Sequence, residues 1–109
     1  MDVQQTLRQY EQAANSRDFD HVAPMVADHA VYWFSDGEFE GLDAIRGAFE
    51  MTWNTIEQER YAIEDVQWVV VGDQAAVCIY QFRSEGVVRG RPFLAVGRGT
   101  NVFALIDGR

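Results

Sequence analysis

The sequence predicts a single α+β domain in which a curved antiparallel sheet wraps around N-terminal helices. Apolar residues fall at helical spacing in the first half, and long alternating strands fill the second half. Aromatic residues are plentiful, with seven Phe, four Tyr and three Trp. Helices followed by a meander of strands are typical of the α+β class. Because one face of the sheet needs cover, we expect it to curl over the helices and enclose a cone with an open mouth, a natural small-molecule pocket.

Two helices are expected at the start of the chain. The first has apolar residues at i, i+4, i+7 and i+11, which places them on one face: Val3, Leu7, Tyr10 and Ala14. Residues 15–18 end this helix and offer capping side chains to a second, shorter one. The apolar side of the second helix is Phe19, Val22 and Val26.

A short strand and a third helix are expected next. Residues 30–34 are β-branched and aromatic, as in strands, and residues 35–38 form a turn. Gly41 then leads into a helix with Asp43 in its first turn, where a carboxylate favours the helix dipole. The apolar face of this helix consists of Ile45, Phe49, Trp53 and Ile56.

The second half of the chain is expected to be sheet. Residues 61–71 and 74–83 flank Gly72-Asp73, a two-residue loop of the type II′ pattern. Residues 85–99 hold four glycines and Pro92, so we expect a bent or looped connection before a third strand at 100–106. Asp107-Gly108 is a further hairpin signal, yet only Arg109 follows it, so a strand is expected to be missing.

Length, charge and cysteine content exclude several classes of protein. The 109 residues suffice for one domain, residues 1–109, with a core of its own. A formal charge of −8 disfavours nucleic acid and anionic membrane surfaces as partners. Residues 1–15 lack a basic start followed by an apolar stretch, so we expect no signal peptide, and no apolar run approaches the roughly 20 residues of a membrane span. The single cysteine, Cys78, allows no internal disulfide, and we expect a cytoplasmic protein.

Four stretches of the chain resemble one family in the right order. They are residues 10–18, 26–31, 39–46 and 97–103, the last running into Asp107-Gly108. The chain resembles the nuclear transport factor 2-like superfamily, nearest its SnoaL-like and ketosteroid-isomerase-like branches. The resemblance implies a cone-shaped, cystatin-like α+β roll. It also implies a last strand between the first and penultimate strands, absent here, whose slot a neighbouring chain or segment is expected to fill.

The resemblance also provides a test for isomerase chemistry. Ketosteroid isomerases hold an oxyanion with a helix-one Tyr and a protonated Asp, and use a carboxylate base on the first strand. Tyr10 matches the position of that Tyr, but Phe34 occupies the base position. The position of the Asp falls near Thr100 or Asn101. Standard ketosteroid isomerase activity is therefore not expected.

The candidate catalytic residues are Tyr10, His29 and Asp36. His29 follows Asp28 at a strand entry and titrates near neutrality, and Asp36 lies two residues beyond Phe34. Each also has a purely structural interpretation: Tyr10 as a packing aromatic, His29 as a loop residue and Asp36 as a turn former. We expect no metal and no cofactor, because no ligand spacing or phosphate-binding loop is present.

Aromatic residues are the expected lining of a ligand pocket. The candidates are Tyr32, Phe34, Trp53, Trp68, Tyr80, Phe82, Asn101 and Phe103. Cys78, Tyr80 and Phe82 share one face of their strand, but periodicity alone leaves open which face points inward. Four arginines on or beside the strands are candidates for binding a carboxylate or enolate: Arg60, Arg83, Arg91 and Arg98.

Three functions remain open. The first is a small-molecule-binding domain for an apolar or aromatic compound, dimeric through its sheet. The second is a cofactor-free isomerase, cyclase or hydratase that acts on a hydrophobic ring compound. The third is an oligomerisation module like the association domain of calmodulin-dependent kinase, which belongs to the same superfamily.

Overall fold

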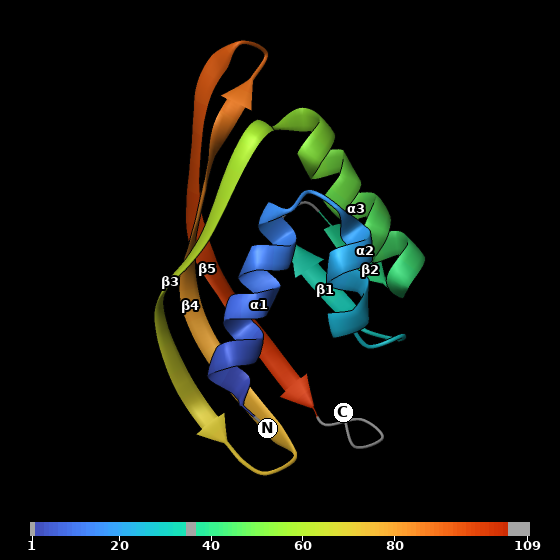
Figure 1. Ribbon diagram of the computed structural model, residues 1–109, viewed down its shortest axis with the longest axis vertical. Coiled ribbons are helices and arrows are strands. Elements are labelled where there is room, and N and C mark those ends of the chain that lie inside the picture. Colours follow the sequence, from blue (N-terminus) through green and yellow to red (C-terminus); the bar gives the residue numbers. More distant parts are fainter. Residues whose placement is uncertain (1, 35–36, 105–109) are drawn as a thin grey trace.

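The computed structural model describes residues 2–34 and 37–104, with only the backbone described for Trp33 and Phe34. Its elements follow the predicted order and confirm the α+β class with a curved antiparallel sheet (Figure 1). No helix in the described part of the chain is long and apolar enough to cross a membrane. The elements are α1 (Val3–Asn15), α2 (Phe19–Val22), η1 (Ala23–Met25), β1 (Val31–Phe34), β2 (Gly37–Glu40), α3 (Leu42–Thr55), β3 (Glu57–Val71), β4 (Ala75–Val88) and β5 (Arg91–Ala104).

The described strands form two separate sheets. The order β3-β4-β5 makes one antiparallel sheet, and β1 pairs with β2 in a hairpin of its own. All three helices lie on one side of the long sheet, with α1 nearest to it (Figure 1). The hairpin β1–β2 differs from the predicted turn over residues 35–38, because Gly37–Glu40 pair with β1 along their whole length.

The prediction of a bent or looped connection at residues 85–99 is wrong. Strand β4 continues to Val88, and β5 begins at Arg91, so only Arg89-Gly90 separates them. Both residues have positive φ, 53° and 76°, the combination that a type I′ hairpin turn requires. The glycines and Pro92 therefore lie inside a long regular hairpin, whose tip extends beyond α3 (Figure 1).

The hairpin between β3 and β4 is where the sequence places it, but its loop differs. Residues 72–74 form the connection, and the amide of Gly72 donates to the carbonyl of Ala75 at 2.9 Å. Gly72 does not have positive φ, so the expected two-residue type II′ turn is wrong. The predicted strand at 100–106 is the end of β5, which the structure describes as far as Ala104.

The structure identifies the inward face of the sheet. Ala76, Cys78 and Ser84 are buried, so the face that also bears Tyr80 and Phe82 points toward the helices. We call this the inner face. The opposite, outer face carries large apolar side chains that remain exposed: Val69, Val70, Ile79, Leu94, Val96 and Val102.

Two hydrophobic cores meet at Tyr10. One core joins the helices and the β1–β2 hairpin around Phe19, Val22, Ile45 and Trp53. The other joins α1 to the inner face around Leu7, Ile63 and Cys78. Tyr10 packs against both cores, so the helix-face residue singled out in the sequence occupies the junction of the fold.

The polar side of α1 covers the free edge of β3. The side-chain amide of Asn15 donates to the carbonyl of Tyr61 and accepts from its backbone N–H, both at 2.7 Å. Glu11 Oε2 accepts from the N–H of Ile63 at 2.6 Å, and Arg8 donates to the Ile63 carbonyl at 3.1 Å. Side chains of α1 thus take the place of a neighbouring strand along this edge.

Candidate functional site

The four tyrosines of the chain converge in the interior. Tyr10 comes from α1, Tyr32 from β1, Tyr61 from β3 and Tyr80 from β4. The Tyr10 hydroxyl interacts electrostatically with the other three, and the Tyr32 hydroxyl with that of Tyr80. We call these four residues the tyrosine cluster. It concentrates phenol hydroxyls in an otherwise apolar region between helix and sheet.

Hydrogen bonds join the cluster in pairs. The hydroxyls of Tyr10 and Tyr32 are 2.7 Å apart, and Tyr61 is hydrogen-bonded to Tyr80. Burial, as the largest cause, raises the pKa of all four hydroxyls above the ordinary tyrosine value. The phenols therefore stay neutral at physiological pH and remain available as hydrogen-bond donors.

Asn101 extends this network onto β5. Tyr80 donates to Asn101 Oδ1 at 2.9 Å. Within residues 2–34 and 37–104 the structure gives no partner to the Nδ2 amide of Asn101. This amide is thus a second kind of neutral donor beside the phenols, on the inner face of the sheet.

Two glycines of β5 make room for the aromatic side chains of β4. Gly97 and Gly99 lie directly opposite Phe82 and Tyr80 in the register. A Cβ atom at Gly99 would lie 2.5 Å from Tyr80 Cζ, and one at Gly97 would lie 2.6 Å from Phe82 Cζ. Both rings therefore lie across the glycine backbone, which fixes the direction of the Tyr80 hydroxyl toward Asn101.

Further aromatic rings surround the cluster. Phe82 stacks on Tyr61 with ring centroids 6.2 Å apart, and Trp68 packs against Phe103 at 5.8 Å. These predicted lining residues lie on the inner face of the sheet. Trp53 lies instead in the helix core, 7% exposed and 5.4 Å from the ring of Phe49, so its contacts are those of a packing residue.

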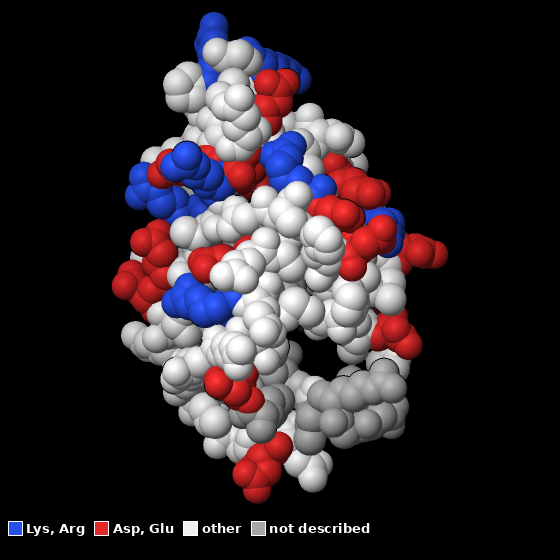
Figure 2. All heavy atoms as spheres, in the orientation of Figure 1, with Lys and Arg blue, Asp and Glu red and all other residues white. Residues whose placement is uncertain are grey.

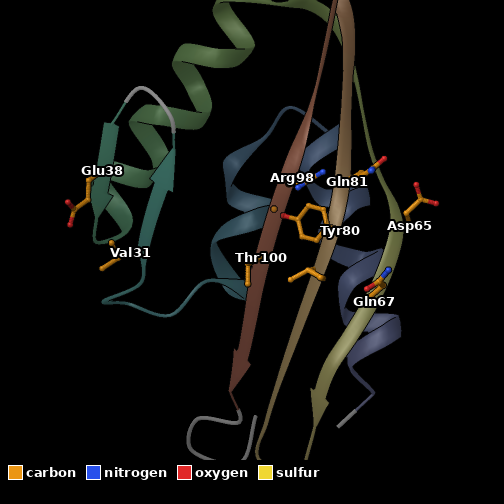
Figure 3. Close-up of a pocket in the computed structure, with 10 residues that line it drawn as sticks. Val31, Glu38, Asp65, Gln67, Tyr80, Gln81, Arg98 and Thr100 are labelled. Carbon is orange, nitrogen blue, oxygen red and sulfur yellow. The ribbon is translucent and has the colours of Figure 1, made fainter.

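A groove of about 900 Å³ lies between the long sheet and the β1–β2 hairpin. Figure 3 shows Val31 and Glu38 on the hairpin, across the groove from β3, β4 and β5. Residues of the outer face form much of its floor: Asp65, Gln67, Ile79, Gln81, Arg98 and Thr100. Tyr80, which lies beside Gly99, is the predicted ligand residue that reaches the groove.

Of the candidate catalytic residues, Tyr10 belongs to the cluster, whereas His29 does not. His29 is exposed in the loop before β1, and no hydrogen bond joins it to Tyr10 among the described residues. Asp36 and the side chain of Phe34 lie outside the described residues. Within that described part, no three His, Cys, Asp or Glu side chains are grouped as metal ligands.

Glu59 is a carboxylate that sequence reasoning missed. It is half-buried, accepts from the buried Ser84 hydroxyl at 2.5 Å, and its charge contributes to the raised pKa of Tyr61. Among the described residues no carboxylate is hydrogen-bonded to Tyr10, Tyr61 or Tyr80. The arrangement is therefore suited to hold a neutral hydrogen-bond acceptor rather than a cation.

Tyr61 was also missed as a member of the site. Its place depends on the pairing of β3 with β4, where Tyr61 is opposite Ser84 and its ring stacks on that of Phe82. The signal available in the sequence was small: a tyrosine at the start of a predicted long strand.

Comparisons with known proteins agree with this fold. The sequence profile of the SnoaL-like domain matches residues 7–109, whereas no curated protein sequence matches significantly. A nuclear transport factor 2-like superfamily protein from Salmonella enterica serovar Typhimurium is 19% identical, with a TM-score of 0.85 over 96% of this chain and 78% of that one. These matches confirm the resemblance carried by the four sequence stretches.

Two further solved structures share the fold. The association domain of Caenorhabditis elegans calcium/calmodulin-dependent kinase II is 17% identical, with a TM-score of 0.79 over 99% of this chain and 85% of that one. A candidate scytalone dehydratase from Novosphingobium aromaticivorans is 10% identical, with a TM-score of 0.82 over 98% of this chain and 74% of that one. At these identities the likeness establishes the fold and leaves function to the site.

Proposed function

The chain belongs to the SnoaL-like domain family, and on that premise we propose that it binds a small, uncharged ring compound that carries a carbonyl or hydroxyl oxygen. The observation that carries this proposal is the convergence of all four tyrosines with Asn101 on the inner face of the sheet. Such a site offers several neutral donors at one place and apolar rings around them. The expected location remains the cytoplasm, in line with the free, buried thiol of Cys78.

The polar end of the ligand is recognised by neutral donors. A carbonyl oxygen accepts from the Asn101 Nδ2 amide, and the raised pKa of Tyr80 keeps its hydroxyl protonated beside it. A carboxylate ligand is disfavoured, because no arginine is hydrogen-bonded into the described tyrosine cluster and the chain carries a net charge of −8.

The ring of the ligand packs against the aromatic residues of the inner face. Phe82, Trp68 and Phe103 provide flat apolar surfaces there, and the absence of a side chain at Gly97 and Gly99 lets the rings of Phe82 and Tyr80 lie flat across β5. An aromatic pair contributes roughly 0.5–1.5 kcal/mol beyond simple area burial. A bicyclic or larger ring system is thus the expected size class.

A matched pair of probes tests this proposal. 2-Acetonaphthone and 2-ethylnaphthalene differ chiefly in the carbonyl oxygen, so their affinities are compared by fluorescence titration. We expect the ketone to bind more tightly, and Asn101→Leu to weaken ketone binding by roughly 3–10-fold, since a neutral hydrogen bond contributes about 0.5–1.5 kcal/mol. Thr100→Val removes a hydroxyl from the opposite face of the same strand and is expected to change neither affinity. Equal affinity for both probes would contradict the proposal.

Binding rather than turnover is the better-supported function of the cluster. A cofactor-free isomerisation or dehydration needs a base within hydrogen-bond reach of the substrate. Glu59 is the carboxylate whose charge acts on Tyr61 of the cluster, so it is the candidate base. Its Oε2, however, already accepts a hydrogen bond from the Ser84 hydroxyl. If the protein is an enzyme, Glu59→Gln should abolish turnover of a ring ketone while leaving ketone binding unchanged.

We propose self-association as a second function, favoured by the outer face. Six large apolar side chains on it are 41–70% exposed, among them Ile79, Leu94, Val96 and Val102. Several exposed apolar side chains on one face of a sheet indicate an interaction site. Light scattering over a range of concentrations is expected to give a dimer mass, and a constant monomer mass would contradict this proposal.

A further inference from the structure

The two edges of the long sheet differ in their cover. At the edge of β3, side chains of α1 are hydrogen-bonded to the backbone groups of Tyr61 and Ile63. The other edge is β5, and among residues 2–34 and 37–104 neither a strand nor a side chain is hydrogen-bonded to that side of it. An open strand edge carries a row of unpaired N–H and C=O groups, so it is a template for a further strand.

Strand register shows which residues of β5 present backbone groups to this edge. The turn Arg89-Gly90 closes on the hydrogen-bonded pair Val88–Arg91, and from there hydrogen-bonded and non-hydrogen-bonded pairs alternate. The even-numbered residues from 92 to 104 are therefore in non-hydrogen-bonded pairs, with N–H and C=O directed away from β4. Pro92, which has no N–H, is in such a position and blocks the edge near the hairpin tip. From residue 94 to residue 102 the edge is open.

Strand β1 has an open edge of the same kind. The Gly41 amide donates to the Ala30 carbonyl at 3.0 Å, so these two residues extend the β1–β2 ladder as a hydrogen-bonded pair. By the same alternation, Val31 and Trp33 direct their backbone groups away from β2. Figure 3 shows β1 on the side of the hairpin that faces β5, with Val31 at about the height of Thr100. Two open strand edges therefore border the groove.

We propose that the groove binds an extended peptide segment of a partner protein, which adds a strand between β5 and β1. The arrows of β5 and β1 point in opposite directions in Figure 3, so a strand that is antiparallel to β5 is parallel to β1. Antiparallel pairing with the long edge of β5 is the stronger of the two contacts. The edge from residue 96 to residue 102 is about 20 Å long and accommodates about seven peptide residues.

The surroundings of the groove define the side-chain pattern of the segment. Successive side chains of an inserted strand point alternately to the inner and the outer face. Those on the inner face approach Tyr80 and the aromatic rings around it, so apolar residues fit there. Those on the outer face lie between Val31 and Thr100 and remain open to water, so polar residues fit there. In antiparallel pairs, residues directly opposite share a face, so the polar residues are the ones whose N–H and C=O groups face β5.

Charge complementarity favours a basic segment. The groove is lined by the carboxylates of Glu38 and Asp65 and by the guanidinium of Arg98, and none of these three is in an ion pair within the described part of the chain. On the face shown in Figure 2, most basic side chains lie in the upper half, toward the hairpin tip. With a formal charge of −8 on the whole chain, a segment flanked by lysines is attracted and an acidic one is repelled.

A matched set of peptides tests the proposal. The probe is the fluorescein-labelled peptide Lys-Val-Thr-Val-Thr-Val-Lys, whose valines point inward and whose threonines have backbone groups that face β5. N-methylation of both threonines removes two donors to β5 and should weaken binding, measured by fluorescence anisotropy, at least about tenfold. The control peptide carries the same two methyl groups as O-methylthreonine, which keeps both N–H groups, and its affinity should stay within about threefold of the probe.

Proline substitution tests the same contact from the side of the protein. The Thr100 amide faces the open edge, so Thr100→Pro preserves the ladder with β4 but blocks the incoming strand. We expect it to weaken binding of the probe at least about fivefold. Leu94→Pro is the matched control, because its amide faces the same edge but Leu94 does not line the groove; affinity should change less than about threefold. Far-ultraviolet circular dichroism verifies that both variants are folded.

Amide hydrogen exchange of the wild-type chain identifies the pairing directly. The bound probe should slow exchange at the amides of Arg98 and Thr100 at least about tenfold and leave those of Gly99 and Asn101, which face β4, unchanged. Binding with this exchange pattern supports the added strand. No binding at about 1 mM, or equal binding of the N-methylated peptide, would overturn it. A chain mass that falls in Thr100→Pro, with no protection by the probe, would identify a second copy as the occupant and would also overturn it.

Discussion

Substitution of Gly99 by alanine tests whether the Tyr80 ring lies across this position of β5. The ring of Tyr80 lies across this glycine, and an alanine Cβ there would lie 2.5 Å from Cζ, 2.6 Å from Cε2 and 2.7 Å from the hydroxyl oxygen. These distances are far inside van der Waals contact, so the ring must move. Gly99 does not have positive φ, so Gly99→Ala introduces no backbone strain of the left-handed kind.

The expected cost combines two effects. Overpacking in a well-packed region costs about 1–3 kcal/mol, and loss of the 2.9 Å hydrogen bond from Tyr80 to Asn101 costs about 0.5–1.5 kcal/mol. Replacing glycine stabilises the protein by about 0.4–1 kcal/mol through the unfolded chain. The net expectation is a loss of roughly 2–3 kcal/mol, or about 10–15 °C in Tm.

Urea unfolding followed by tryptophan fluorescence measures this loss. Gly47→Ala on α3 is the control, since a Cβ there meets nothing within 4 Å and should stabilise the helix by about 0.5–1 kcal/mol. In a Tyr80→Ala background the added methyl at Gly99 has room, so Gly99→Ala should cost little. Equal stability of Gly99→Ala and wild type, or an equal cost in both backgrounds, would refute the placement of Tyr80.

Three further predictions concern the same network. Tyr10→Phe should lower the free energy of unfolding by about 1 kcal/mol, because the buried 2.7 Å hydrogen bond to Tyr32 is lost; unchanged urea unfolding would count against that bond. Asn15→Ala should lower the free energy of unfolding by about 1–2 kcal/mol, since the backbone N–H and carbonyl of Tyr61 both lose their partner. Hydrogen exchange at the Tyr61 amide should become faster. An amide as protected as in the wild type would argue that α1 does not cover the edge of β3. Burial raises the pKa of Tyr10, so its contribution to stability is full below the ordinary tyrosine pKa of 10 and is lost as pH rises above it, because the unfolded chain then releases a proton that the folded chain retains. A flat alkaline unfolding profile would contradict this prediction.

Helical periodicity carried most of what could be predicted about the fold. The spacing of Val3, Leu7 and Ala14 identified α1 and its buried face, because a 3.6-residue repeat is local information. The strand β2 was missed because Gly37 and two glutamates leave a four-residue segment with little apolar pattern. Its strand character comes from pairing with β1, which is a tertiary effect.

The glycines of β5 show why part of the site could not be predicted. Gly97 and Gly99 favoured the prediction of a loop, since glycine inside a strand usually weakens the strand. Their role depends on Phe82 and Tyr80 lying directly opposite, and that register is set by a turn at Arg89-Gly90 many residues away. Likewise, alternation grouped Tyr80 with Cys78 and Phe82, but only burial against α1 identified that group as the inner face.

The candidate site residues differ in what led to them and in where the structure places them. Tyr10 was proposed from its match to the helix-one tyrosine of ketosteroid isomerases, and the structure places its hydroxyl 2.7 Å from that of Tyr32. His29 was proposed because imidazole titrates near neutrality and because it follows Asp28 at a strand entry, and it is exposed. Tyr61 enters the site through the pairing of β3 with β4, and Glu59 lies at an irregularity of that pairing between Glu57 and Arg60; sequence periodicity encodes neither.

The most direct test of the central claim is a nuclear magnetic resonance titration of protein with labelled tyrosine rings and backbone amides against 2-acetonaphthone. The tyrosine cluster as binding site predicts that the four tyrosine signals and the Asn101 side-chain amide shift first and saturate together. Amides of the outer face, such as Ile79 and Thr100, should shift less. Shifts confined to the outer face and its groove, with tyrosine signals unchanged, would contradict the claim.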